Sequence, residues 1–153
     1  MSDDRTLDQI ISDLETQVDQ FAGILAAPHD ALWRKPSADE WSAAMCVVHI
    51  SDAETHVAAR LRRMLTEDNP PFPNWDEELH MALSHDRSPE IAFAVIASLR
   101  ASNADLARHI TSEQLARVGT RPDGEVVNVL QLLDGHINHT AAHLEQARAA
   151  LGQ

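Results

Sequence analysis

The chain has 153 residues, a length that predicts one domain over residues 1–153. Its 24 Asp and Glu against 12 Lys and Arg give a formal net charge of −12, which argues against nucleic-acid and anionic-membrane partners. The single cysteine excludes an intrachain disulfide, and no apolar run reaches the roughly 18 residues of a membrane span, so we expect a soluble cytoplasmic protein.

Two amphipathic helices are predicted in the first half of the chain. Residues 5–27 carry apolar side chains at steps of three and four, a spacing that is typical of a helix with one buried face. A connection containing Trp33 follows, and we expect Trp33 and Trp41 to close one end of the core. Ser37 and Glu40 match a capping box, so the second helix is predicted over residues 39–65.

The second half of the chain predicts two more helices. Residues 67–88 contain a run of prolines and form a long link, in which DEELHMAL could make a short helix. Ser88 and Pro89 are typical of a helix start, which predicts a third helix to about Ile110. The GTRPDG segment breaks the chain, and a fourth helix is predicted over about 126–151. No strand is expected. The fold class is therefore all-α, a four-helix bundle with a long crossover between helices two and three.

Three histidines lie close together on the fourth predicted helix: His136, His139 and His143. His139 and His143 are four residues apart, which places both on one helix face at a spacing that lets two imidazoles share one metal ion. The alternative is that these histidines are on the surface or hydrogen-bonded within the core. The four histidines at positions 29, 80, 85 and 109 are expected in loops or at helix ends, with no role in such a site.

The second predicted helix offers a further imidazole. His49 lies among core residues, where a single histidine is usually a satisfied structural residue, but here it could complete a three-nitrogen site with open coordination positions. Asp52 follows by three and could be a fourth ligand, a hydrogen-bond acceptor for an imidazole, or a surface charge. His56 and Cys46 are weaker candidates, and Cys46 is more readily explained as a small buried residue.

Two motifs resemble those of DinB/YfiT-like proteins. The segment WSAAMCVVHISDAE, residues 41–54, is similar to the family's W-S-x-x-x-x-x-x-H-x-x-D-x-E, and HTAAHLEQ, residues 139–146, is similar to H-x-x-x-H-x-x-Q. The approach GTRPDGEVVNVLQLL is similar too, and the resemblance covers about residues 7–150. It implies a bundle that binds nickel, zinc, iron or manganese through His49, His139 and His143. It also implies a homodimer and, in some members, a reaction that uses a low-molecular-weight thiol.

Three functions remain open from the sequence. The first is a metal-dependent enzyme, either a hydrolase or a thiol-dependent transferase acting on a small thiol or electrophile. In that reading Asp52 and Glu54 are possible acid or base groups, although Glu54 is expected to pair with a cation such as Arg60. The second is a non-catalytic metal-binding or stress-response protein, and the third is a bundle with structural histidines. Arginines at positions 60, 62, 63 and 121 could anchor a carboxylate, but the sequence does not place them.

Overall fold

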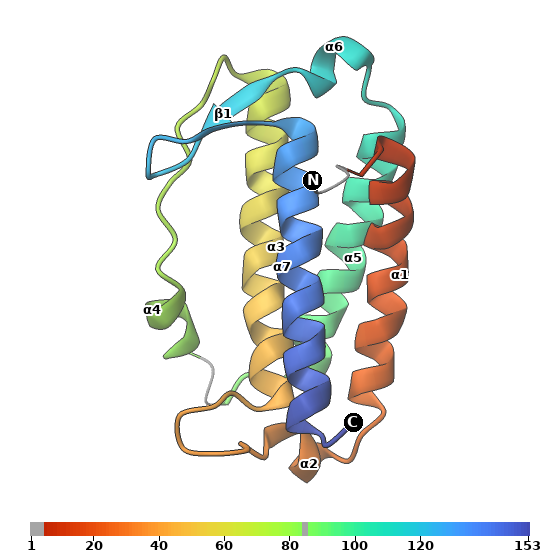
Figure 1. The fold of residues 1–153 in the computed structure, drawn as a ribbon, viewed down its shortest axis with the longest axis vertical. Coiled ribbons are helices and arrows are strands. Elements are labelled where there is room, and N and C mark those ends of the chain that lie inside the picture. The colour runs from red at the N-terminus through yellow and green to blue at the C-terminus, as the bar shows by residue number, and fades with distance from the viewer. Residues whose placement is uncertain (1–4, 84–85) are drawn as a thin grey trace.

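Four long helices form the body of the protein (Figure 1), which is described here from a computed structural model covering residues 5–83 and 86–153. They are α1 (Leu7–Leu25), α3 (Ala43–Thr66), α5 (Pro89–Arg108) and α7 (Val129–Ala150). Three short helices and two strands lie in the connections: α2 (His29–Trp33), α4 (Glu77–Met81), α6 (Ser112–Leu115), β1 (Val118–Thr120) and β2 (Val126–Asn128). Within the described part of the chain, no helix is both long and apolar enough to cross a membrane.

The order of the helices around the bundle differs from their order in the chain. Helices α1 and α3 both pack against α5 and α7, so α1 and α3 are diagonal to each other, as are α5 and α7. Helices α3 and α5 are neighbours that run in the same direction, and the link between them returns along the whole bundle (Figure 1). The predicted four-helix bundle with a long crossover between the second and third long helices is therefore confirmed.

The predicted helix starts are partly correct. Ser88 caps α5 by accepting from the Ile91 N–H at 3.2 Å, and the expected short helix in the link is α4. The capping box at Ser37 and Glu40 is wrong, because α3 begins at Ala43 after the N-cap Ser42, which accepts from the Met45 N–H at 3.2 Å. The later start leaves Trp41 outside the helix.

A β-hairpin replaces the start of the fourth predicted helix, so the expectation of no strands is wrong. Strand β1 pairs antiparallel with β2, with Gly119 opposite Val127, and the turn between them contains Gly124 at φ 91°. Glycine adopts this left-handed conformation without steric cost. Helix α7 then starts at Val129, because Asn128 forms a capping box with Gln131.

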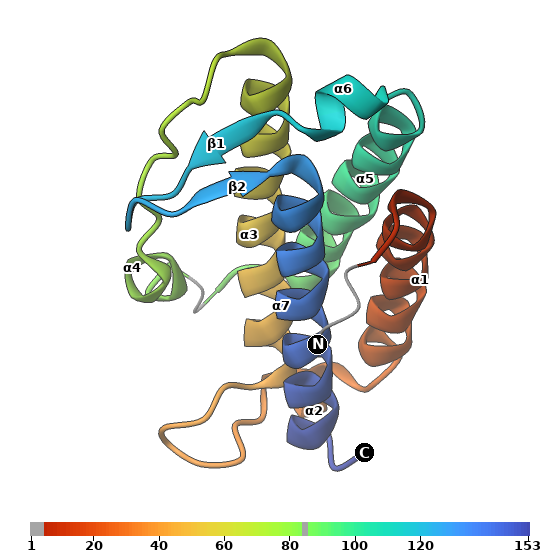
Figure 2. The same ribbon diagram turned by 45° about the horizontal axis from the view of Figure 1, so that its top comes forward.

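The link after α3 is attached to this hairpin. The Phe72 N–H donates to the Thr120 carbonyl at 2.8 Å, and the Thr120 N–H donates to the Pro70 carbonyl at 3.0 Å. The Phe72 ring packs so closely on β1 that a Cβ at Gly119 would lie 2.4 Å from it, so only glycine fits there. Figure 2 shows the hairpin over one end of α3 and α7, with α4 further along the same side. This attachment positions the residues that follow Phe72.

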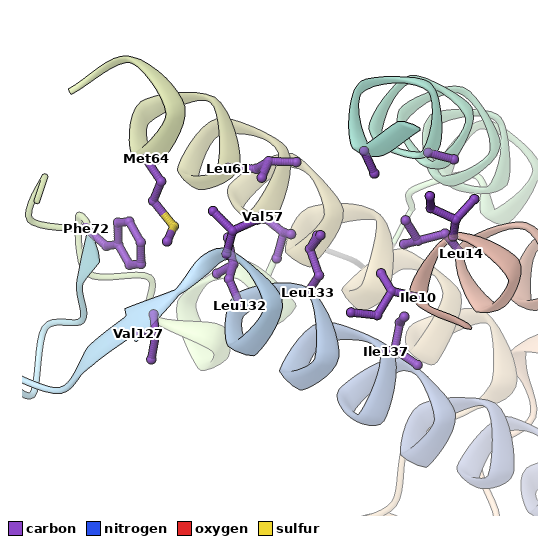
Figure 3. Close-up of a cluster of buried hydrophobic side chains, with 14 residues drawn as sticks. Ile10, Leu14, Val57, Leu61, Met64, Phe72, Val127, Leu132, Leu133 and Ile137 are labelled. Carbon is purple, nitrogen blue, oxygen red and sulfur yellow. The ribbon is translucent and has the colours of Figure 1, made fainter. Parts of the chain in front are cut away.

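Two apolar clusters fill the bundle, separated by a buried polar layer. Figure 3 shows the cluster near the hairpin, in which Phe72 and Val127 pack with residues of α1, α3 and α7. The other cluster contains Phe21, Val48 and Leu144 and lies toward the opposite end. The buried polar residues between them come from all four long helices: Gln17, Glu54, Arg100, Asn103, His136 and Thr140.

Candidate metal centre

Three imidazoles meet between two antiparallel neighbours, α3 and α7. His49 comes from α3, and His139 and His143 come from successive turns of α7. The Nε2 atom of His139 lies 3.1 Å from Nε2 of His49 and 3.2 Å from Nε2 of His143. The side chains predicted from the sequence as metal ligands are thus brought together, with one ligand atom of each within 4.8 Å of the others.

The spacing of these nitrogens fits a metal ion. Nitrogens bound to zinc at about 2.0–2.1 Å in a tetrahedral site are about 3.3 Å apart, close to the two Nε2–Nε2 distances here. A neutral imidazole has one N–H and one lone pair. Because His139 Nε2 faces two other ring nitrogens, hydrogen bonding alone satisfies this group poorly, whereas one cation can accept all three lone pairs.

The orientation of His143 is fixed from outside the cluster. Its Nδ1 lies 2.8 Å from the Gln146 side-chain oxygen, which accepts the Nδ1–H and leaves the lone pair on Nε2 facing the other histidines. Such hydrogen bonds orient metal-binding imidazoles and raise their basicity. His49 Nδ1 is buried and has no partner in the described part of the chain, so its ring is held by packing.

Two tryptophans provide that packing. Trp75, in the link, stacks on the His49 ring with centroids 5.3 Å apart, and Trp41 stacks on His143 with centroids 5.5 Å apart. Trp41 also contacts His49 edge to face at 5.0 Å. The late start of α3 and the attachment of the link to the hairpin place these rings. Trp33 and Trp41 both pack against the apolar cluster at that end of the bundle, as expected, and Trp41 additionally contacts the histidines.

The three imidazoles are held in the neutral form that a metal requires. Burial, followed by the neighbouring histidines, lowers the pKa of His49 to about 3, and the same causes lower the pKa of His139 to about 4. Burial also lowers the pKa of His143, although the Gln146 hydrogen bond and the charge of Glu77 act in the opposite direction. Protons therefore compete weakly for this site near neutral pH.

The other candidate ligands lie elsewhere. Both carboxylate oxygens of Asp52 accept from the Arg87 guanidinium at 2.8 Å, so Asp52 is engaged in a bidentate ion pair. Burial raises the pKa of Cys46 to about 12, which keeps its thiol neutral in the apolar core. The His56 ring stacks on Trp75 with centroids 4.9 Å apart, on the side of the cavity described below.

His136 belongs to the polar layer. Its Nε2 lies 2.7 Å from the Glu54 carboxylate, which also accepts from the Arg100 Nε–H at 2.6 Å. The expectation that Glu54 pairs with Arg60 is wrong, because Glu54 is fully buried and faces α5 and α7. Burial alone would raise the pKa of the Glu54 carboxyl, but His136 and Arg100 lower it below its ordinary value. This ion pair joins the helices beside the histidine cluster.

The remaining histidines of the described chain lie outside the cluster. His29 begins α2, His80 is in the last turn of α4, and His109 is the C-cap of α5, as expected for residues at helix ends. The His80 ring does contact Trp75, with centroids 5.6 Å apart. His85 lies outside the described residues.

A cavity of about 320 Å³ opens beside His139. Its wall includes Trp75 and Glu77 from the link and α4, and Arg60 and Arg121 from α3 and the hairpin. The sequence did not single out Trp75 or Glu77 for this site. The signal in the sequence was weak, because a tryptophan between prolines and an acidic run does not indicate where the link lies in the fold.

Together, the fold and the cluster define a four-helix-bundle protein with a candidate three-histidine metal centre. The model of the DinB superfamily matches residues 13–147, and the chain belongs to this superfamily. It is 29% identical over 113 residues to the putative metal-dependent hydrolase BH0277 of Halalkalibacterium halodurans, a match that spans 71% of this chain and 66% of that relative, just under two thirds. A second relative, a putative metal-dependent hydrolase of Bacillus licheniformis, is 23% identical over 99% of this chain and 90% of its own length.

Solved structures show the same fold. YfiT from Bacillus subtilis, described as a probable metal-dependent hydrolase with an unusual four-helix bundle topology, superimposes with a TM-score of 0.89 at 22% identity and covers 98% of this chain and 87% of its own. A mycothiol-dependent maleylpyruvate isomerase superimposes with a TM-score of 0.72 at 13% identity, over 94% of this chain and 61% of its own. At these identities the likeness concerns the fold alone.

Proposed function

We propose that His49, His139 and His143 bind one divalent metal ion and that the protein is a metal-dependent hydrolase of small molecules. The observation that carries this proposal is the convergence of three neutral imidazoles beside a cavity. Three protein ligands are typical of catalytic metal sites, because they leave coordination positions for water and substrate, whereas structural sites use four. The hydrolase names of the two relatives agree with this assignment.

The donor set narrows the choice of metal. Imidazole nitrogen suits zinc, nickel and iron, whereas manganese prefers oxygen ligands, so manganese is the least suited of the four ions expected from the sequence. When bound, such an ion supplies Lewis-acid chemistry and lowers the pKa of a coordinated water toward about 7.

The residues around the site would complete the chemistry. Glu77 lines the cavity and lies near enough to His143 to influence its pKa, so its carboxylate is our candidate proton acceptor during hydrolysis. Trp41 and Trp75 hold the imidazole rings and exclude water from the sides that they cover. Gln146 keeps His143 in the tautomer that directs Nε2 toward the metal.

Thiol transfer is the second candidate. The isomerase that shares this fold depends on a thiol, and a divalent ion can bind a thiolate directly. The arginines of the cavity would give a carboxylated thiol a cationic anchor. A thiol and an electrophile would then both have to fit beside the ion.

One experiment separates these functions. The purified protein is analysed for metals, treated with chelator, and reloaded with zinc, nickel or iron(II). Each form is assayed against esters, amides and lactones, and against electrophiles with small thiols. Hydrolysis that follows metal content and is lost in His139→Ala, but kept in the control His109→Ala, supports the proposal. Stoichiometric metal without turnover on any substrate supports the non-catalytic alternative.

A further inference from the structure

Two arginines face the same cavity from different parts of the fold. Arg60 lies on α3 and Arg121 begins the turn of the hairpin, 61 residues later in the chain, and both line the cavity beside His139. Their charges are close enough that Arg121, after burial, contributes to lowering the pKa of Arg60. Two guanidinium groups that face one space repel each other unless an anion lies between them.

Protein groups leave part of this positive charge uncompensated. Arg60 donates to the Pro73 carbonyl at 3.3 Å and lies 5.0 Å from the centre of the Phe72 ring, and no carboxylate of the described residues pairs with it. Its Nε is buried and has no partner in that part of the chain. Arg121 pairs with Glu125 at 3.0 Å, an exposed contact of the kind that contributes little. Glu77, on the same cavity, forms no ion pair with either arginine among the described residues.

A glycine inside α7 keeps the cavity open. Gly135 lies one turn, about 6 Å, before His139 and on the same helix face. A Cβ at this position would lie 3.5 Å from the Arg121 Nη2, an ordinary contact distance, so alanine would also fit. A longer side chain would fill the space between Arg121 and His139.

We propose that Arg60 and Arg121 form an anion subsite that binds the carboxylate of a small substrate while its reactive group lies at the His49, His139 and His143 centre. The proposal rests on the proposed function, because it states where the charged end of the hydrolase substrate binds. Both arginines line the same cavity of about 320 Å³ as His139, so one small molecule in that cavity can contact the arginines and the histidine centre. The net charge of −12 repels polyanions, whereas a small carboxylate can enter a pocket whose local charge is positive.

The subsite is tested without metal, so that a carboxylate cannot bind to the ion instead. Metal-free protein is titrated calorimetrically with glutarate and with glutaramide, its neutral isostere. We expect saturable glutarate binding, at least tenfold tighter than glutaramide binding, because charge-assisted hydrogen bonds to guanidinium are lost with the amide. Arg60→Gln and Arg121→Gln should each weaken glutarate binding about tenfold or more, and Gly135→Leu should abolish it.

The control is Arg108→Gln, which removes an exposed arginine that pairs with Glu15 far from the cavity and should bind glutarate as the wild type does. Circular dichroism checks that every variant folds. Equal binding of glutarate and glutaramide, or unchanged glutarate binding in both Arg60→Gln and Arg121→Gln, would overturn the proposal. Arginine-dependent glutarate binding supports the subsite even if the metal-loaded protein hydrolyses nothing, a result that would overturn the hydrolase assignment alone.

Discussion

The Nε2 atom of His136 lies 2.7 Å from the Glu54 carboxylate in the centre of the bundle, one helical turn from a candidate metal ligand, His139. The Arg100 guanidinium completes this group by donating to the same carboxylate oxygen. Two neighbouring histidines of one helix thus have different partners: His139 faces other imidazoles, and His136 faces an ion pair. Because their partners differ, substitutions of His139 and of His136 should have different effects on metal binding and on stability.

Removing the charge of Glu54 should destabilise the fold. In Glu54→Gln, the buried Arg100 loses its only fully buried carboxylate partner among the described residues, and breaking such a pair costs about 3–5 kcal/mol of the free energy of unfolding. Urea denaturation followed by circular dichroism measures the change. Glu67→Gln, which breaks an exposed pair with Arg63, is the control and should leave the urea midpoint unchanged. Equal midpoints for the two variants would contradict this prediction.

Metal removal should lower the melting temperature. A ligand that binds only the folded state stabilises it by mass action, by about 2.7 kcal/mol at a hundredfold excess over Kd. Because the candidate ligands come from both α3 and α7, a bound ion would link these helices. Differential scanning calorimetry before and after chelation, with metal content verified, measures the shift. An unchanged melting temperature after complete removal would argue against a site shared by the two helices.

Single histidine substitutions should separate ligands from neighbours. His49→Ala, His139→Ala and His143→Ala should each abolish stoichiometric metal binding, since no fourth imidazole reaches the cluster among the described residues. His136→Ala should weaken metal affinity by at most about 10–100-fold, the range for a residue that lies beside the ligands but does not bind the ion. Metal content and affinity are measured on folded variants, with His29→Ala as the unaffected control. Loss of metal in His136→Ala with retention in His139→Ala would reverse the assignment.

Acid should destabilise the metal-free protein through these imidazoles. A histidine in the unfolded chain has a pKa of about 6.5, whereas burial lowers the pKa of His49 to about 3 and that of His139 to about 4. Between those values the unfolded state binds more protons than the folded state, so the free energy of unfolding should fall as pH decreases from about 6.5 to about 4. Urea denaturation across that range should show that the free energy of unfolding depends less steeply on pH in His139→Asn than in the wild type. Parallel profiles for the variant and the wild type would show that His139 does not remain neutral on folding.

Tryptophan fluorescence should report metal binding directly. Trp75 stacks on His49 and Trp41 stacks on His143, so an open-shell ion such as nickel(II) at the centre would lie close to both rings and quench their emission. The quenching should saturate at one equivalent and decrease in Trp75→Phe. Trp33→Phe is the matched control, because Trp33 packs in the apolar cluster at the end of the bundle. Quenching that is unaffected by Trp75→Phe would place the ion elsewhere.

The sequence predicted what depends on helical periodicity and missed what depends on long-range packing. The spacing of His139 and His143 defines one helix face, so their proximity followed from local geometry. The hairpin was missed because strands of three residues carry no measurable alternation. The predicted ion pair of Glu54 with Arg60 was wrong for a related reason. Arg60 is near in sequence, whereas Arg100 comes from a helix whose position only the tertiary structure reveals. Trp75 reached the site through the attachment of its link to the hairpin, which no local pattern indicates.

The diagonal arrangement of α1 with α3, and of α5 with α7, has a consequence for how the chain folds. In a bundle of successive antiparallel neighbours, each helical hairpin can form early from contacts that are local in sequence. Here the antiparallel neighbours are α1 with α5 and α3 with α7, which are far apart in the chain, and the α3–α5 pair is joined only by a long crossover. Loops of this size must close before native contacts form, so the protein should fold more slowly than an up-and-down bundle of equal length. Since His49 and His139 are separated by 90 residues, the histidine cluster can assemble only after both halves of the chain have met.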